Sequence, residues 1–111
     1  MRHMTARKTH FRGWAIPGVL APGADLAEFE TVPADQTLDA LSGHFKIFQY
    51  KDGHRFSTDD VAVAGFASRH APQAARVLDL GTGICTVGLI CACKLPGARF
   101  VVIEAEAHMV H

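Results

Sequence analysis

The sequence lacks the features that mark membrane proteins, disulfide-rich secreted proteins and strongly charged proteins. Its longest apolar run, Val87 to Cys93, is far shorter than the roughly 20 residues that span a bilayer. No apolar stretch with a small-residue cleavage site begins the chain. The three cysteines crowd into nine of the 111 residues and cannot build a disulfide framework. Eleven basic and eleven acidic side chains leave no net charge, which excludes a protein that wraps nucleic acid by charge alone. We therefore expect a cytoplasmic protein without a membrane partner.

The charges that are present are segregated along the chain. Residues 1–14 carry four basic side chains and no acid, whereas residues 15–43 carry five acids and no base. The first 37 residues also contain three prolines, several glycines and little periodicity. We expect residues 1–37 to form an irregular arm and residues 38–111 to form a folded domain. The basic start could contact RNA phosphates, although a solvated tail is the simpler interpretation.

Regular structure is expected to begin near Thr37. Residues 45–50 mix aromatic and β-branched side chains and are followed by a turn signal at 51–54. Residues 55–57 can then return as the second strand of a short hairpin. A helix is expected next, because Ser57 or Thr58 provides an N-cap and two aspartates follow in the first turn, where the helix dipole favours acids.

Residues 76–104 have the pattern of a βαβ unit. Residues 76–80 form a short apolar run that ends at a glycine-containing turn, as expected of a buried parallel strand. Residues 86–95 are apolar nearly all round, which suits a helix that is covered on two sides. Residues 99–103 form a second apolar strand, and the whole unit has the length of a βαβ crossover. The fold class is therefore predicted to be α/β.

The turn between the first strand and the helix has the chemistry of a cofactor site. Gly81 and Gly83 let the backbone approach a ligand without a Cβ between them. Glu104 follows Gly83 by 21 residues, which matches the spacing of an acid that binds a ribose diol. An adenosine-type cofactor is therefore expected at the carboxyl ends of the two strands.

Two further residues indicate which cofactor fits. Thr86 stands where the dinucleotide fingerprint needs a third glycine, which argues against NAD or FAD, and no Walker loop is present. Asp79 would repel a pyrophosphate but can accept hydrogen bonds from an ammonium group. Asp79 can also tie down the glycine loop, and the two roles are compatible. A cationic cofactor without phosphate fits best.

Three segments carry a family resemblance. Residues 77–85, VLDLGTGIC, resemble motif I of class I S-adenosylmethionine-dependent methyltransferases, and residues 101–105 resemble their second motif. Residues 52–61, DGHRFSTDDV, resemble the segment before motif I in the methyltransferase small domain group. They are most similar to bacterial enzymes that methylate the exocyclic amine of an adenine in tRNA. The resemblance covers about residues 38–107. It implies a Rossmann-like fold, S-adenosyl-L-methionine as the cofactor and tRNA or other RNA as a partner. The cofactor-binding residues that it implies in motif I and the second motif are Asp79, Gly81, Thr82, Gly83 and Glu104. It also implies that Arg55, Ser57 and Asp59 form a wall of the cofactor site. Helix capping and surface pairing are the alternative roles of the last three.

The sequence departs from this family at two points. Cys85 stands where relatives carry glycine, and a side chain there would crowd the cofactor or require a positive φ, at about 1–3 kcal/mol. We therefore expect weakened cofactor affinity. The group also uses an Asn/Asp-Pro-Pro-aromatic motif to hold the flipped adenine. This sequence contains no asparagine and no two adjacent prolines, so the acceptor site is absent.

The sequence predicts a methyltransferase acting on adenine in tRNA or other RNA, truncated after the second parallel strand. Such a chain is expected to be inactive alone and to self-associate through exposed sheet edges. A methyltransferase for a protein or small-molecule acceptor and a non-catalytic cofactor-binding or partner subunit remain open. A nucleotide-binding oxidoreductase is disfavoured by Thr86. No metal site is expected, because the cysteines and histidines lack ligand spacing.

Overall fold

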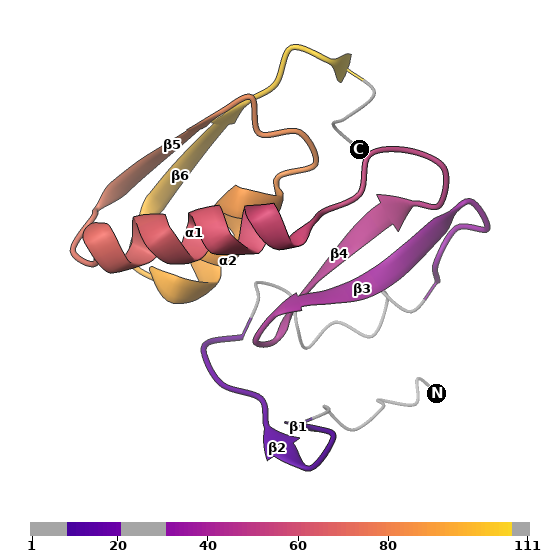
Figure 1. Ribbon diagram of the computed structural model, residues 1–111, viewed down its shortest axis with the longest axis horizontal. Coiled ribbons are helices and arrows are strands. Elements are labelled where there is room, and N and C mark those ends of the chain that lie inside the picture. The colour runs from indigo at the N-terminus through magenta and orange to yellow at the C-terminus, as the bar shows by residue number, and fades with distance from the viewer. Residues whose placement is uncertain (1–8, 21–30, 108–111) are drawn as a thin grey trace, which may run out of the picture.

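The structure is a computed structural model that describes residues 9–20 and 31–107 (Figure 1). Its strands form three two-stranded sheets, of which β1–β2 and β3–β4 are antiparallel and β5–β6 is parallel. The elements follow in the order β1 (His10–Phe11), β2 (Trp14–Ala15), β3 (Gln36–Ser42), β4 (Phe45–Tyr50), α1 (Thr58–His70), β5 (Arg76–Leu80), α2 (Thr86–Lys94) and β6 (Arg99–Ile103). The predicted α/β class is confirmed at this level. In the part of the chain that is described, no helix is both long and apolar enough to cross a bilayer.

The predicted βαβ unit is confirmed in β5, α2 and β6. The two strands pair in parallel with Leu78 opposite Val101, and their bounds match the prediction. The helix ends at Lys94, and the following Leu95 carbonyl accepts a hydrogen bond from Ala98 at 3.0 Å in the turn to β6. The pairing brings the carboxyl ends of both strands together beside the start of α2.

The core lies where α2 packs against α1. Ile90 of α2 and Ala64 of α1 are completely buried, and Cys91 is 3% exposed. The small side chain of Ala64 lets the two helices approach closely. Partly buried apolar residues complete the cluster: Leu41, Val87 and Phe100. The helix α2 is therefore covered by α1 on one side and contacts the strands on others, as its nearly uniform apolar surface predicts.

The predicted hairpin pairing is wrong. β4 pairs with the preceding β3, in a register that places Leu38 opposite Phe48, and not with residues 55–57. A β-bulge between Ala40 and Ser42 interrupts the alternation of side chains between the two faces of β3. The strand therefore lacks the regular period-two pattern by which strands are predicted from sequence. Residues 55–57 instead run past the hairpin into α1 without joining a sheet.

The prediction of an irregular arm is wrong for residues 10–15, which form the β1–β2 hairpin. Residues 1–8 and 21–30 of the same arm lie outside the described residues. The helix start is as predicted: Ser57 is the N-cap of α1, and the Asp60 carboxylate accepts a hydrogen bond from the Ser57 amide at 3.1 Å.

One face of the β5–β6 sheet is open. Side chains on this face alternate with those that face α2, so four of the five exposed aliphatic residues of these strands point the same way. They are Leu78, Leu80, Val101 and Ile103, with exposed fractions of 57%, 70%, 59% and 52%. This is the apolar surface expected of a parallel strand pair without further neighbours.

Candidate functional site

The loop between β5 and α2 turns tightly because three of its residues have left-handed backbone conformations. Gly81 has φ 65°, Gly83 has φ 60° and Cys85 has φ 72°. The amide of Thr82 donates to the Ile103 carbonyl at 3.0 Å and thereby ties the loop to the end of β6. A positive φ is free for glycine but strained for cysteine. The expectation that position 85 requires a positive φ is confirmed.

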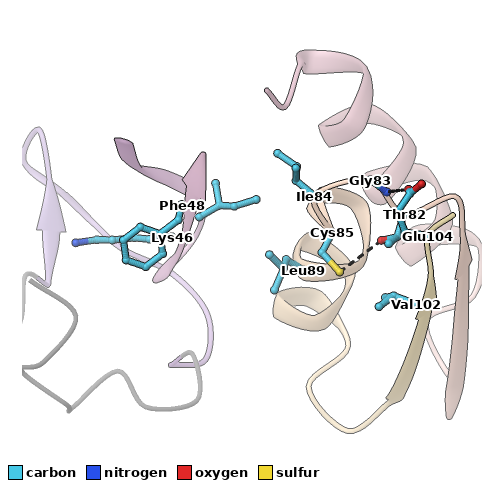
Figure 2. A pocket seen from close by; sticks show the side chains of 10 residues that line it. Lys46, Phe48, Thr82, Gly83, Ile84, Cys85, Leu89, Val102 and Glu104 are labelled. Carbon is cyan, nitrogen blue, oxygen red and sulfur yellow. Dashed lines mark hydrogen bonds between the residues drawn. The ribbon is translucent and has the colours of Figure 1, made fainter. Parts of the chain in front are cut away.

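Glu104 lies against this loop, as its spacing predicts. Its Oε2 accepts a hydrogen bond from the Gly83 amide at 2.6 Å (Figure 2), and its Oε1 accepts one from the Glu106 amide at 3.0 Å. These two amides hold the carboxylate in place beside the glycine loop.

Asp79 anchors the same loop from inside β5. Its Oδ2 accepts a hydrogen bond from the Thr82 hydroxyl at 2.7 Å. It also lies 3.3 Å from the position that a Cβ on Gly88 would occupy, so glycine permits the close passage of α2 over the strand. Asp79 therefore ties down the loop, as expected, and does so through the Thr82 hydroxyl.

A cavity of about 290 Å³, here called the acidic cavity, lies at the carboxyl ends of β5 and β6. Three carboxylates line it, from Asp60, Asp79 and Glu104, and no lysine or arginine of the described chain does so. The full lining is His54, Asp60, Asp79, Gly81, Thr82, Gly83, Thr86, Val87 and Glu104. Negative charge converging on a partly buried space favours a positively charged ligand.

Thr86 gives the acidic cavity a second distinctive feature. It opens helix α2, is 3% exposed, and its hydroxyl finds no hydrogen-bond partner among the residues placed by the structure. Buried hydroxyls are nearly always paired, and each exception needs an explanation. Thr86 is also one of the residues that line the acidic cavity.

A second cavity of about 450 Å³, here called the apolar cavity, lies on the other side of the glycine loop. It shares Thr82, Gly83 and Glu104 with the acidic cavity. In Figure 2, β4 with Lys46 and Phe48 lies across from Ile84, Cys85 and Leu89, and the Lys46 side chain points away from these three residues.

The structure brings together five of the eight predicted cofactor residues. Asp79, Gly81, Thr82, Gly83 and Glu104 all line the acidic cavity. Arg55, Ser57 and Asp59 line neither cavity. Ser57 caps α1 and Asp59 is exposed in its first turn, so the structure shows the alternative roles, and a cofactor role for this trio stays a prediction.

Arg55 belongs to a polar cluster on the β3–β4 hairpin. Its guanidinium donates to the Tyr50 carbonyl at 2.8 Å, to the Thr37 hydroxyl at 3.0 Å and to the Asp39 carboxylate at 3.1 Å. Gln49 is 2% exposed and also donates to Asp39, at 2.8 Å. Hydrogen bonds from Thr37 and then Gln49 are the largest causes that lower the pKa of Asp39; burial raises this pKa by less than either of them, and the Arg55 charge lowers it further. This cluster fixes the segment that leads into α1.

Two residues of the site were missed by sequence reasoning. His54 and Asp60 line the acidic cavity and bracket the Arg55–Asp59 element. Asp60 is half-buried while Asp59 is exposed, although both fall in the first helical turn. No signal in the sequence identifies them, because both residues reach the cavity only once α1 packs against α2.

Comparison with known proteins adds no assignment. No family model matches the chain, and no curated protein or solved structure matches it. Among the residues that the structure describes, no group of three or more histidine, cysteine, aspartate or glutamate side chains could hold a metal ion.

Proposed function

We propose that the chain is the cofactor-binding unit of a Rossmann-like, S-adenosylmethionine-dependent methyltransferase. The observation that carries the proposal is the acidic cavity at the carboxyl ends of two parallel strands, with three carboxylates and the unpartnered Thr86 hydroxyl. S-adenosylmethionine carries a sulfonium and an ammonium group but no phosphate. Both positive charges are complementary to this lining, whereas a pyrophosphate would be repelled by it.

Each chemical group of the cofactor has a matching residue in the lining of the acidic cavity. Asp79 and Asp60 are the acceptors for the cationic methionine end. Glu104, held by the Gly83 amide, is the acceptor for the ribose diol. The Thr86 hydroxyl at the start of α2 is a donor for the methionine carboxylate, which a helix N-terminus also favours. The cofactor supplies an activated methyl group, and the chain supplies orientation and charge.

The proposed methyl acceptor is the exocyclic amine of an adenine in tRNA or another RNA. Support comes from the resemblance of residues 52–61 to enzymes of that type. The acceptor-binding Asn/Asp-Pro-Pro-aromatic motif is absent from this sequence. The proposal therefore assigns cofactor binding to this chain and methyl transfer to an assembly that adds acceptor-binding residues. This absence equally favours a second candidate, a non-catalytic cofactor-binding subunit.

The test is calorimetric binding of S-adenosylmethionine, S-adenosylhomocysteine and NADH to the chain and to a matched pair of variants. We expect both adenosyl ligands to bind and NADH to fail. Asp60→Asn should weaken S-adenosylmethionine binding about tenfold or more, because hydrogen bonds to charged groups contribute about 1.5–3 kcal/mol. Asp35→Asn, which replaces an exposed aspartate that lines neither cavity, should leave binding unchanged. Tighter binding of NADH than of either adenosyl ligand would contradict the proposal.

A further inference from the structure

The β1–β2 hairpin is a regular element that contributes no residue to the proposed cofactor site. Its central residues, Arg12 and Gly13, have φ 50° and 84°, the pair of positive values that a two-residue type I′ turn requires. The Ile16 amide donates to the Thr9 carbonyl at 2.8 Å and closes the hairpin. Figure 1 shows it beyond the β3–β4 hairpin, at the end of the molecule away from β5–β6.

Two aromatic side chains stand together on this hairpin. Phe11 and Trp14 are directly opposite each other in the antiparallel pair, so their side chains project from the same face. Trp14 is 80% exposed and Phe11 is 53% exposed. Adjacent exposed apolar side chains of this kind mark interaction sites.

The hairpin also carries positive charge. The guanidinium carbon of Arg12 lies 5.2 Å from the centroid of the Phe11 ring, within the range of a cation–π contact. In the sequence, residues 1–24 contain four basic side chains and no acid. Aromatic faces beside a cation, in a stretch without carboxylates, are complementary to unpaired bases on a phosphate backbone.

The hairpin is held in a defined place by the segment that follows it. The position of a Cβ on Gly18 lies 3.6 Å from Cys93 Sγ of α2. The Pro17 carbonyl oxygen lies 2.6 Å from the position of a Cβ on Gly43, in the turn between β3 and β4. These contacts attach the hairpin and its aromatic pair to the rest of the fold, so the pair does not depend on a flexible linker for its position.

We propose that the β1–β2 hairpin is a binding platform for single-stranded RNA, on which Phe11 and Trp14 stack unpaired bases while Arg12 contacts the adjacent phosphate. The choice of RNA rests on the proposed function, which requires an RNA acceptor. The binding itself needs neither cofactor nor acceptor pocket, so it is measurable on this chain alone.

Trp14 makes the test direct because it is the only tryptophan in the sequence. Titration with a short adenine-rich single-stranded RNA should quench its emission through stacking, while a duplex of the same length should quench far less. In fluorescence anisotropy with labelled RNA, Phe11→Ala and Trp14→Ala should each weaken binding about tenfold. Phe66→Ala removes a comparably exposed aromatic of α1, 59% exposed, and should not change RNA affinity. Arg12→Gln should reduce the slope of log affinity against log salt by about 0.7.

Binding of S-adenosylhomocysteine to the same variants separates this proposal from the cofactor site. The hairpin variants should retain cofactor affinity, which also shows that they are folded. If the Trp14→Ala variant keeps its affinity for both the cofactor and RNA, the proposal of an RNA platform is wrong and the proposed function is unaffected. Preference for anionic phosphatidylserine vesicles over RNA, or equal affinity for duplex and single strand, also overturns it. RNA binding through the hairpin without any cofactor binding would support the platform and contradict the proposed function.

Discussion

Replacing Thr86 by valine separates the folding role of this residue from its binding role. Valine has nearly the same shape and the same β-branching, so the substitution removes the hydroxyl and little else. In the ligand-free chain that hydroxyl is buried, and the described residues offer it no partner. A buried polar group without a hydrogen bond is destabilising by about 1–3 kcal/mol.

We therefore expect Thr86→Val to raise the free energy of unfolding of the ligand-free chain by about 1 kcal/mol, at the lower end of that range. For a chain of this size the melting temperature should rise by about 4 °C or more. With S-adenosylhomocysteine the sign reverses, because the ligand loses a hydrogen bond of about 0.5–1.5 kcal/mol. Its dissociation constant should rise by roughly two- to tenfold.

Urea unfolding followed by circular dichroism measures the first effect, and calorimetry measures the second. Thr86→Ser is the control, because it keeps the hydroxyl and removes a methyl group; it should lower stability and preserve binding. A Thr86→Val variant that is less stable than the parent by 1 kcal/mol or more would refute the reasoning, because the hydroxyl would then have a partner in the free chain.

Three further substitutions test other parts of the structure. Cys85→Gly should stabilise the chain by about 1 kcal/mol, since glycine removes the strain of φ 72°. The same substitution should strengthen S-adenosylhomocysteine binding. Equal affinities of the parent chain and the variant for this ligand would refute the argument that Cys85 crowds the cofactor. Gly43→Ala should destabilise by about 1–3 kcal/mol, because φ is 54° and the new Cβ would meet the Pro17 carbonyl at 2.6 Å. Gly97→Ala meets no atom within 4 Å and serves as its control in the same urea series. Asp39 has a pKa below its ordinary value of 3.8, so its contribution to stability is present above that pH and is lost as the pH falls through the lowered pKa. Asp39→Asn should remove this acid-dependent step from unfolding curves recorded at descending pH, and an unchanged acid limb would show that the carboxylate is not stabilised in the fold.

The βαβ unit was predictable because its signals are local. Apolar runs of strand length, a glycine turn and an apolar helix segment follow one another without interruption, and the right element type follows from each. The pairing of β4 was not predictable in the same way. The bulge in β3 breaks the alternation that identifies a strand. Residues 55–57 stay outside the sheet, where Arg55 bonds to Thr37 and Asp39, which are remote in sequence.

The candidate site was also predictable only in part. Glycines with positive φ and an acid at the end of the next strand are fixed by position along the chain, so Gly81, Gly83 and Glu104 could be assigned from spacing. Asp60 and His54 could not, because they reach the acidic cavity through the packing of α1 against α2.

The sequence by itself determined the α/β class, the parallel strand pair and the glycine loop, because local propensity and backbone conformation depend on near neighbours in the chain. Only the tertiary structure decided which carboxylates converge, that Thr86 is left without a partner and that Phe11 and Trp14 stand exposed. These properties depend on distances between segments remote in sequence and on solvent access, which arise when the elements pack.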